Sequence, residues 1–128
     1  MDKSLTGKKG EDFAADYYLK KGYEIKARNY HSRYGEVDII AAKDNVVVFI
    51  EVKTRDEKAL GRPAEAVNKA KQKKLVLTSI KYMENLPVNI FCRFDVFEVW
   101  QKEGRIYKFN CIENAFEAED FSGRYDIF

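Results

Sequence analysis

The spacing of hydrophobic and polar positions along the chain predicts a mixed α/β fold. Apolar side chains recur at helical spacing over residues 8–21, and Gly22 then ends the predicted helix. A second helix is predicted over residues 63–85, with Pro63 in its first turn. Alternating or short apolar runs predict strands over residues 23–28, 35–43, 46–53, 88–100 and 105–110, and loops over residues 29–34 and 54–62. The expected fold is an α/β sandwich, a mixed sheet of about five strands flanked by helices.

The two strands over residues 35–53 carry the pattern with the clearest chemical meaning. Asp44 and Asn45 fit a two-residue hairpin turn, and that turn places Asp38 opposite Glu51 on one face of the pair. The same face carries Glu36, Ile40, Phe49 and Lys53, whereas the other is wholly apolar and predicted to be core: Val37, Ile39, Ala41, Val48, Ile50 and Val52. The charged end of this hairpin is therefore the first candidate site.

Two carboxylates directly opposite each other repel, so the pairing of Asp38 with Glu51 needs compensation. A divalent cation such as Mg²⁺ would supply it, because Mg²⁺ is often held by one or two carboxylates, waters and substrate phosphates. Lys53 points to the same face and could hold a water or offset charge on a phosphate. The alternative is a solvent-facing sheet surface of mixed charge.

Both predicted helices add candidate residues. Glu11 shares a helix face with small and apolar residues, which is unusual for a carboxylate unless it is paired or binds metal. The alternative is a glutamate in the first turn, favoured by the helix dipole. The second helix carries Gln72 among lysines that suit a phosphate backbone, or that form only a solvated face: Lys69, Lys71, Lys73, Lys74 and Lys81. The one histidine, His31, is predicted to be a polar surface residue.

Composition bounds the class of protein. The chain has 128 residues, which fits one domain, and 45% hydrophobic residues exclude disorder. Its two cysteines have no zinc-site spacing, and neither a signal peptide nor a membrane span is visible. We expect a reduced, cytoplasmic protein with no membrane association.

The net charge of +2 argues against a strongly basic nucleic-acid binder, but it conceals segregation of charge along the chain. The hairpin is acidic, and the segment over residues 53–81 is strongly basic. Residues 113–128 form a second acidic stretch, so we divide the chain into a domain over residues 1–112 and a C-terminal tail over 113–128. A basic segment directly after an acidic site is the arrangement that a nucleic-acid backbone requires.

The residues of the hairpin resemble the active site of the PD-(D/E)XK nuclease superfamily. The resemblance rests on Gly35-Glu36-Val37-Asp38, followed after twelve residues by Glu51-Val52-Lys53, a short spacing similar to archaeal Holliday-junction resolvases and RecB-like nucleases. The chain resembles more closely the YraN family of uncharacterised bacterial proteins, uncharacterised protein family 0102. That likeness extends in order from residue 7 to residue 96, through stretches such as Arg28-Asn29-Tyr30, Gly61-Arg62-Pro63 and Arg93-Phe94-Asp95-Val96. Val37 stands where the superfamily name has proline, which supplies no chemistry there.

The resemblance implies a restriction-endonuclease-like fold and hydrolysis of phosphodiester bonds with Mg²⁺ or Mn²⁺. It implies that Asp38 and Glu51 bind the metal and that Lys53 is the catalytic lysine. Glu11 matches the helix carboxylate of the resolvase-like branch, and Gln72 matches the helix glutamine of RecB-like members. Glu36 is a candidate ligand for a second metal, and Asp95 is a candidate for the site or for a structural role.

Three functions follow as hypotheses. The first is a metal-dependent nuclease acting on DNA, with branched or otherwise structured DNA as a candidate substrate, and working as a homodimer. Its candidate contacts to the DNA backbone are Arg55, Arg62, Lys69, Lys71, Lys73 and Lys74. The second is a nucleic-acid-binding protein on the same fold without catalysis. The third is a protein-interaction module whose charges serve solubility alone, and that module would bind no metal.

Overall fold

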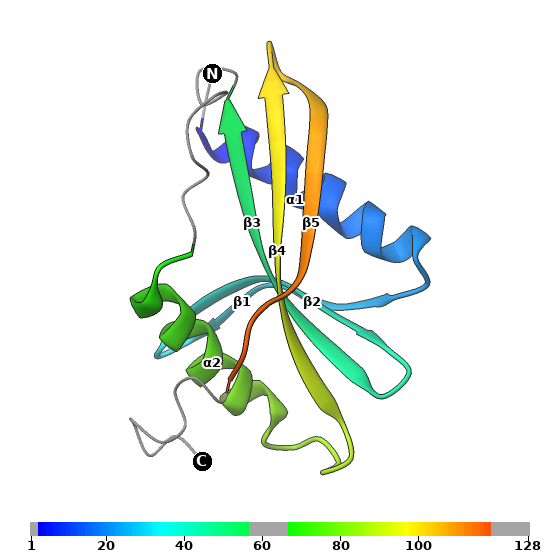
Figure 1. Ribbon diagram of the computed structural model, residues 1–128, viewed down its shortest axis with the longest axis vertical. Coiled ribbons are helices and arrows are strands. Elements are labelled where there is room, and N and C mark those ends of the chain that lie inside the picture. Colours follow the sequence, from blue (N-terminus) through cyan, green and yellow to red (C-terminus); the bar gives the residue numbers. More distant parts are fainter. Residues whose placement is uncertain (1–2, 57–66, 119–128) are drawn as a thin grey trace.

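The computed structural model describes residues 3–56 and 67–118, with side chains from residue 7 onward (Figure 1). Within these two ranges, two helices and five strands follow one another. They are α1 (Lys3–Lys20), β1 (Glu24–Ser32), β2 (Gly35–Lys43), β3 (Val46–Asp56), α2 (Lys69–Met83), β4 (Phe91–Lys102) and β5 (Arg105–Phe116). None of the described helices is both long enough and apolar enough to cross a membrane.

The five strands form one mixed sheet in the order β1-β2-β3-β4-β5. All neighbouring pairs are antiparallel except β3 and β4, which are parallel and are joined through α2. A parallel pair needs such a crossover, because a short turn cannot return the chain to the start of the next strand. This α/β architecture is consistent with a restriction-endonuclease-like sandwich and confirms the predicted fold class.

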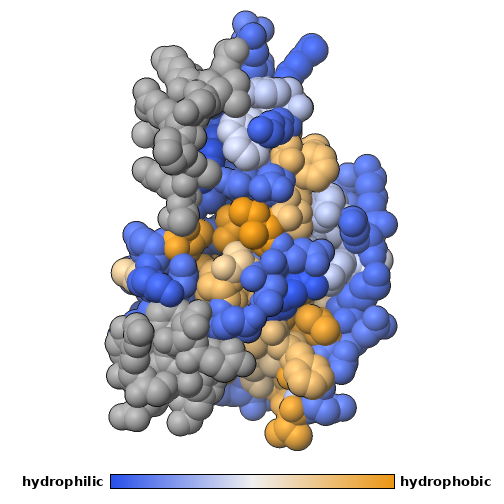
Figure 2. Space-filling view, in the orientation of Figure 1, coloured by the Kyte–Doolittle hydropathy of each residue, from blue (hydrophilic) through white to orange (hydrophobic). Residues whose placement is uncertain are grey.

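Each face of the sheet is covered by one helix. Figure 1 shows α1 crossing behind the upper parts of β3, β4 and β5, while α2 lies toward the lower part of the molecule. Cluster A, on the α1 side, includes Ala14, Tyr18 and the β2–β3 residues Ile39, Ala41, Val48 and Ile50. Cluster B, on the α2 side, includes Val37, Ile40, Phe49, Leu75 and Val76. Figure 2 shows apolar residues gathered in the middle of the visible face, with hydrophilic residues along its right-hand side.

Two details of the predicted core are wrong. The hairpin pattern predicts core on one face only, yet Ile40 and Phe49 on the other face are just as buried. Val37 belongs to cluster B rather than to the face of Ile39. The physical reason is that Val37 pairs with Tyr30 of β1, whose ring also packs against cluster B.

Strand ends differ from their predicted bounds because pairing partners extend them. β1 continues to Ser32 through a segment predicted to be a loop, since Tyr30, His31 and Ser32 all pair with β2. β3 continues to Asp56 because β4 pairs with it over that whole length. β5 continues to Phe116, well past its predicted end. The assignment of the remaining tail stays a prediction, because residues 119–128 lie outside the described part.

The second helix begins later than predicted. Asn68 is its N-cap, and the Asn68 side chain accepts a hydrogen bond of 2.8 Å from the backbone N–H of Lys71. Such a cap satisfies one of the N–H groups that a helix start leaves without an intrahelical partner. Pro63, the predicted first-turn residue, lies outside the described residues.

The first helix begins earlier than predicted, at Lys3, so Glu11 lies in the helix interior rather than in its first turn. The helix-dipole explanation for Glu11 is therefore wrong, because that effect is confined to the terminal turn. Gly10 brings this part of α1 close to the sheet. A methyl group at Gly10 would collide with Thr54 Oγ1 and would lie 3.1 Å from Val99 Cγ2.

We predict opposite effects for alanine at the two glycines of α1. Gly7 has no atom within 4 Å of an added Cβ, so Gly7→Ala should stabilise the fold by about 0.5–1 kcal/mol through helix propensity. Gly10→Ala should destabilise it by about 1–2 kcal/mol, because the same propensity gain is outweighed by overpacking. Urea unfolding of both variants measures the difference. Equal stabilisation by the two substitutions would contradict the close approach at Gly10.

Candidate functional site

The candidate site lies where β2 and β3 separate. Their ladder runs from Lys43 and Val46 at the turn to Ile39 and Ile50, and the predicted register is confirmed over that length. The next residues on the two strands are Asp38 and Glu51. Asp38 Oδ2 accepts a hydrogen bond of 2.7 Å from the backbone N–H of Val52, in place of a backbone carbonyl of β2. The Asp38 side chain thus holds the two strands together at the point where their regular pairing stops.

Glu51 is buried at this point, with 7% of the residue exposed. Its Oε1 atom lies 3.9 Å from Lys53 Nζ on the same strand and 3.7 Å from Lys71 Nζ in the first turn of α2. Its Oε2 atom is buried and has no hydrogen-bond partner among the described residues. A buried carboxylate oxygen without a partner is costly, so Glu51 is the residue that most needs an additional ligand.

The pKa values of both carboxyls are raised, which disfavours their charged forms. Burial, followed by the charge of Asp38, raises the pKa of Glu51 to about 7. Burial also raises the pKa of Asp38, while the hydrogen bond from Val52 and the Lys71 charge act in the opposite direction. The chain therefore brings together two carboxyl groups that resist ionisation and two lysines that only partly offset them.

Two further carboxylates stand beside this pair. Burial and then Asp38 raise the pKa of Glu11, and Glu36 adds to the effect. The side-chain amide of Asn29 joins the two: its nitrogen donates to Glu36 Oε1 at 3.0 Å and to Glu11 Oε1 at 3.1 Å. Asn29 has a backbone φ of 53°, in the left-handed region that few residues other than glycine and asparagine adopt.

The sequence does not predict a role for Asn29, because its pattern assigns residues 29–34 to a loop. Its neighbour Arg28 is also missed. Arg28 Nη2 lies 2.7 Å from Asp12 Oδ1 and 4.0 Å from Glu11 Oε1, which ties β1 to α1 beside the site. The only sequence feature that singles out these two residues is the stretch Arg28-Asn29-Tyr30 of the family resemblance.

The residues predicted on α2 take different positions. Gln72 lies next to Lys71 in the first turn; its Nε2 donates to the Val67 carbonyl at 2.7 Å, and its Oε1 is buried without a partner among the described residues. The Cβ of Lys74 lies near Gly35 at the start of β2. Lys69 and Lys73 belong to the same helix, and only Lys71 is shown to reach Glu51.

Of the two arginines predicted in residues 54–62, the structure describes Arg55, which pairs within the sheet. Arg55 Nε donates to Glu98 Oε2 at 3.0 Å, and both side chains are largely buried. Glu98 Oε1 accepts a further hydrogen bond of 3.3 Å from Asn110. Arg55 is therefore engaged in a buried ion pair within the sheet. Arg62 lies outside the described residues.

Asp95 is fully occupied by protein partners. Its two oxygens accept hydrogen bonds from the Arg93 guanidinium at 2.8 Å, from the Tyr18 hydroxyl at 2.7 Å and from the Asn114 backbone N–H at 3.0 Å. Burial, with the adjacent Asp95, raises the pKa of Tyr18 far above its usual range, so the hydroxyl stays protonated and donates. Asp95 has two candidate roles, one in the site and one in the structure. Its contacts favour the structural role, because they tie α1, β4 and β5 together.

The donor set fits a divalent cation held mainly by solvent and substrate. In residues 3–56 and 67–118, no group of three or more His, Cys, Asp and Glu side chains converges closely enough to hold a metal ion. Asp38 and Glu51 nevertheless provide two neighbouring carboxyl groups. The Oε2 atom of Glu51 has no partner among the described residues. Mg²⁺ commonly takes one or two carboxylates and completes its shell with waters and phosphate oxygens.

Comparisons with known proteins match residues 10–99 to the family described as "Uncharacterised protein family UPF0102". The UPF0102 protein of Chloroherpeton thalassium is 44% identical over 117 residues, which cover 89% of this chain and 90% of that protein. The UPF0102 protein of Syntrophomonas wolfei is 44% identical over 109 residues, which cover 84% of this chain and 93% of that protein. That of Caldicellulosiruptor saccharolyticus is 40% identical over 118 residues, covering 91% and 100%.

We predict that Glu51→Gln stabilises the metal-free protein at neutral and alkaline pH. The pKa of Glu51 is about 7 in the folded protein and near 4.5 in the unfolded chain, so the folded state holds its proton more tightly. The wild-type protein then loses stability as pH rises between these values. Glutamine does not titrate, so its advantage should grow from near zero at pH 4 to about 3 kcal/mol above pH 7.

Glu98→Gln is the matched control, since it makes the same change at a buried glutamate on the neighbouring strand. Because it removes the negative charge that faces the Arg55 guanidinium inside the protein, it should destabilise the protein by about 3 kcal/mol. Urea unfolding at a series of pH values, in the presence of a chelator, measures both variants. Destabilisation by Glu51→Gln at pH 8 would show that the Glu51 charge is satisfied without a cation.

Proposed function

This chain belongs to the UPF0102 family, and we propose that it is a nuclease that hydrolyses phosphodiester bonds in DNA with Mg²⁺ or Mn²⁺. The observation that carries the proposal is the pairing of Asp38 with Glu51. One buried oxygen of Glu51 has no partner among the described residues, and two lysines stand 3.7–3.9 Å from its other oxygen. A fold alone does not imply a function, so this site is the basis of the argument.

Each residue of the site has a distinct role in the proposed reaction. Asp38 and Glu51 would hold the cation, with Glu11 and Glu36 beside them as additional acceptors for its bound waters. A bound divalent cation lowers the pKa of a coordinated water and stabilises charge on the reacting phosphate. Lys53 positions the attacking water or the phosphate oxygen, and its positive charge offsets the negative charge that develops during attack. The Oε1 atom of Gln72 has no partner among the described residues, and it orients that water or the substrate.

The second candidate function is a nucleic-acid-binding protein without catalysis. It is favoured by the absence, among the described residues, of three converging metal-binding side chains. Against it stands the cost of keeping two carboxyls with raised pKa values together in a site with no task for them. The homodimer and the cytoplasmic location expected from the sequence stay predictions.

Cleavage of defined DNA substrates tests the proposal. We predict that pure protein with Mn²⁺ cleaves at least one of a branched, a single-stranded and a duplex substrate, and that Asp38→Asn lowers the rate by about 100-fold or more. Asp16→Asn, an exposed residue paired with Lys20 near the other end of α1, should leave the rate unchanged. Equal cleavage by the wild type and Asp38→Asn would identify a contaminant. Binding of DNA by both without cleavage of any substrate would favour the second function.

The two lysines beside Glu51 provide a sharper comparison. Lys53 and Lys71 have the same side-chain exposure, 36%, and nearly the same distance to Glu51 Oε1. We predict that Lys53→Ala lowers kcat by about 100-fold or more, whereas Lys71→Ala mainly raises KM and lowers kcat less than about tenfold. Equal losses of kcat would mean that both lysines act only by neutralising Glu51.

A further inference from the structure

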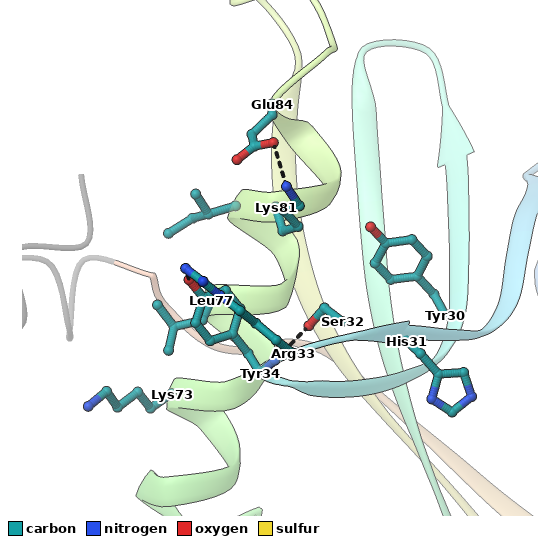
Figure 3. Close-up of a pocket in the computed structure, with 10 residues that line it drawn as sticks. Tyr30, His31, Ser32, Arg33, Tyr34, Lys73, Leu77, Lys81 and Glu84 are labelled. Atoms are coloured by element: carbon teal, nitrogen blue, oxygen red, sulfur yellow. Dashed lines mark hydrogen bonds and ion pairs between the residues drawn. The ribbon is translucent and has the colours of Figure 1, made fainter.

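A second hollow, separate from the carboxylates, lies between the β1–β2 turn and α2 (Figure 3). Its volume is about 690 Å³, within the range of small-molecule sites. Residues 30–34 form one wall. The other wall consists of four residues on one side of α2 and of the residue that caps its C-terminal end: Lys73, Leu77, Ile80, Lys81 and Glu84.

The β1–β2 turn presents an arginine and a tyrosine side chain to this hollow. The Arg33 guanidinium lies 4.8 Å from the centre of the Tyr34 ring, and Arg33 Nη2 donates to the Tyr34 hydroxyl at 2.6 Å. Ser32 Oγ accepts from the Tyr34 backbone N–H at 3.0 Å and lies 3.0 Å from Thr78 Oγ1 of α2. Figure 3 shows Arg33 and Tyr34 beside each other, and both line the hollow together with Leu77. We call this stacked pair the Arg33–Tyr34 platform.

The charge of the hollow favours an anion. Three of its lining residues, Arg33, Lys73 and Lys81, are cationic. The one carboxylate among the lining residues is Glu84, which lies 3.2 Å from Lys81. An aromatic ring beside a guanidinium, with lysines nearby, is the combination that binds an unpaired nucleotide through its base and its phosphates.

The hollow adjoins the candidate active site through His31. This residue lines the hollow, and its Nδ1 lies 4.0 Å from Glu36 Oε2. Glu36 in turn shares the Asn29 amide with Glu11. His31 therefore stands between the hollow and Glu36, at the edge of the candidate site.

We propose that this hollow binds an unpaired nucleotide of a DNA strand, with its base stacked on the Arg33–Tyr34 platform and its phosphates beside Lys73 and Lys81. This inference rests on the proposed nuclease function and narrows its substrate to DNA with a single-stranded segment. Paired bases are already stacked inside the duplex and cannot offer a free ring face to the platform.

Fluorescence anisotropy with the full chain, in a chelator so that no cleavage occurs, tests the inference. The probes are a labelled single strand and a blunt duplex of the same length. We expect the wild type to prefer the single strand, and Tyr34→Leu to weaken single-strand binding by about fivefold or more while changing duplex binding less than about twofold. Tyr34→Phe keeps the ring and should retain the preference. An unchanged preference in Tyr34→Leu, or no preference in the wild type, would overturn the inference.

If Tyr34→Leu does not fold, substitutions at two exposed residues, Arg33 and Lys81, test the inference instead. Arg33→Gln should reduce the single-strand preference, and Lys81→Ala should weaken binding and make it less dependent on salt. Lys20→Ala is the matched control for Lys81→Ala, because Lys20 also lies in the last turn of a helix and pairs with an acidic residue, Asp16. Losses of equal size in Lys20→Ala and Lys81→Ala would overturn the inference.

The outcome is separable from that of the proposed function. Asp38→Asn should keep the single-strand preference while it loses cleavage. Tyr34-dependent binding in a protein that cleaves no substrate would leave this inference standing and remove the nuclease proposal. Equal cleavage of blunt duplex and single-stranded substrates by both the wild type and Tyr34→Leu would leave the nuclease proposal standing and overturn this inference.

Discussion

Asp38 and Glu51 lie next to each other where β2 and β3 separate. Much of the surrounding structure depends on the electrostatic repulsion between these two carboxyl groups. The Asp38 side chain accepts the Val52 N–H that the broken ladder leaves without a backbone acceptor. Lys53 and Lys71 approach one oxygen of Glu51, and its other oxygen stays buried without a described partner. Such a pair carries a cost in free energy, because burial and the nearby negative charge both oppose ionisation.

The elements around the pair bring further charged groups close to it. Gly10 lets α1 lie against β3, which brings Glu11 close enough for Asp38 to raise its pKa. The start of α2 supplies Lys71, and the rest of that helix forms one wall of the basic hollow. The β1–β2 turn joins the two regions, because His31 contacts Glu36 and the Arg33–Tyr34 platform follows directly. Site and hollow thus share the same two elements, β1 and α2.

Local rules explain what could be predicted from the sequence. The Asp44-Asn45 turn and the alternation around it predict the hairpin register and hence the juxtaposition of Asp38 with Glu51. Contacts between distant segments explain what could not be predicted. Val37 follows its partner Tyr30 into cluster B, and β1 continues through the supposed loop because β2 pairs with it. Asn29 bridges two carboxylates, and Arg55 pairs with Glu98, a residue far along the chain. Neither contact leaves a local pattern in the sequence.

The central claim is that Asp38 and Glu51 form a cation site, and calorimetric titration with Mn²⁺ at pH 8 tests it most directly. At that pH Glu51, with a pKa of about 7, has lost its proton. The account predicts saturable Mn²⁺ binding by the wild-type protein and by Asp16→Asn, and its loss in Glu51→Gln. Binding that persists unchanged in Glu51→Gln, or no binding by the wild type either alone or with DNA, would contradict it.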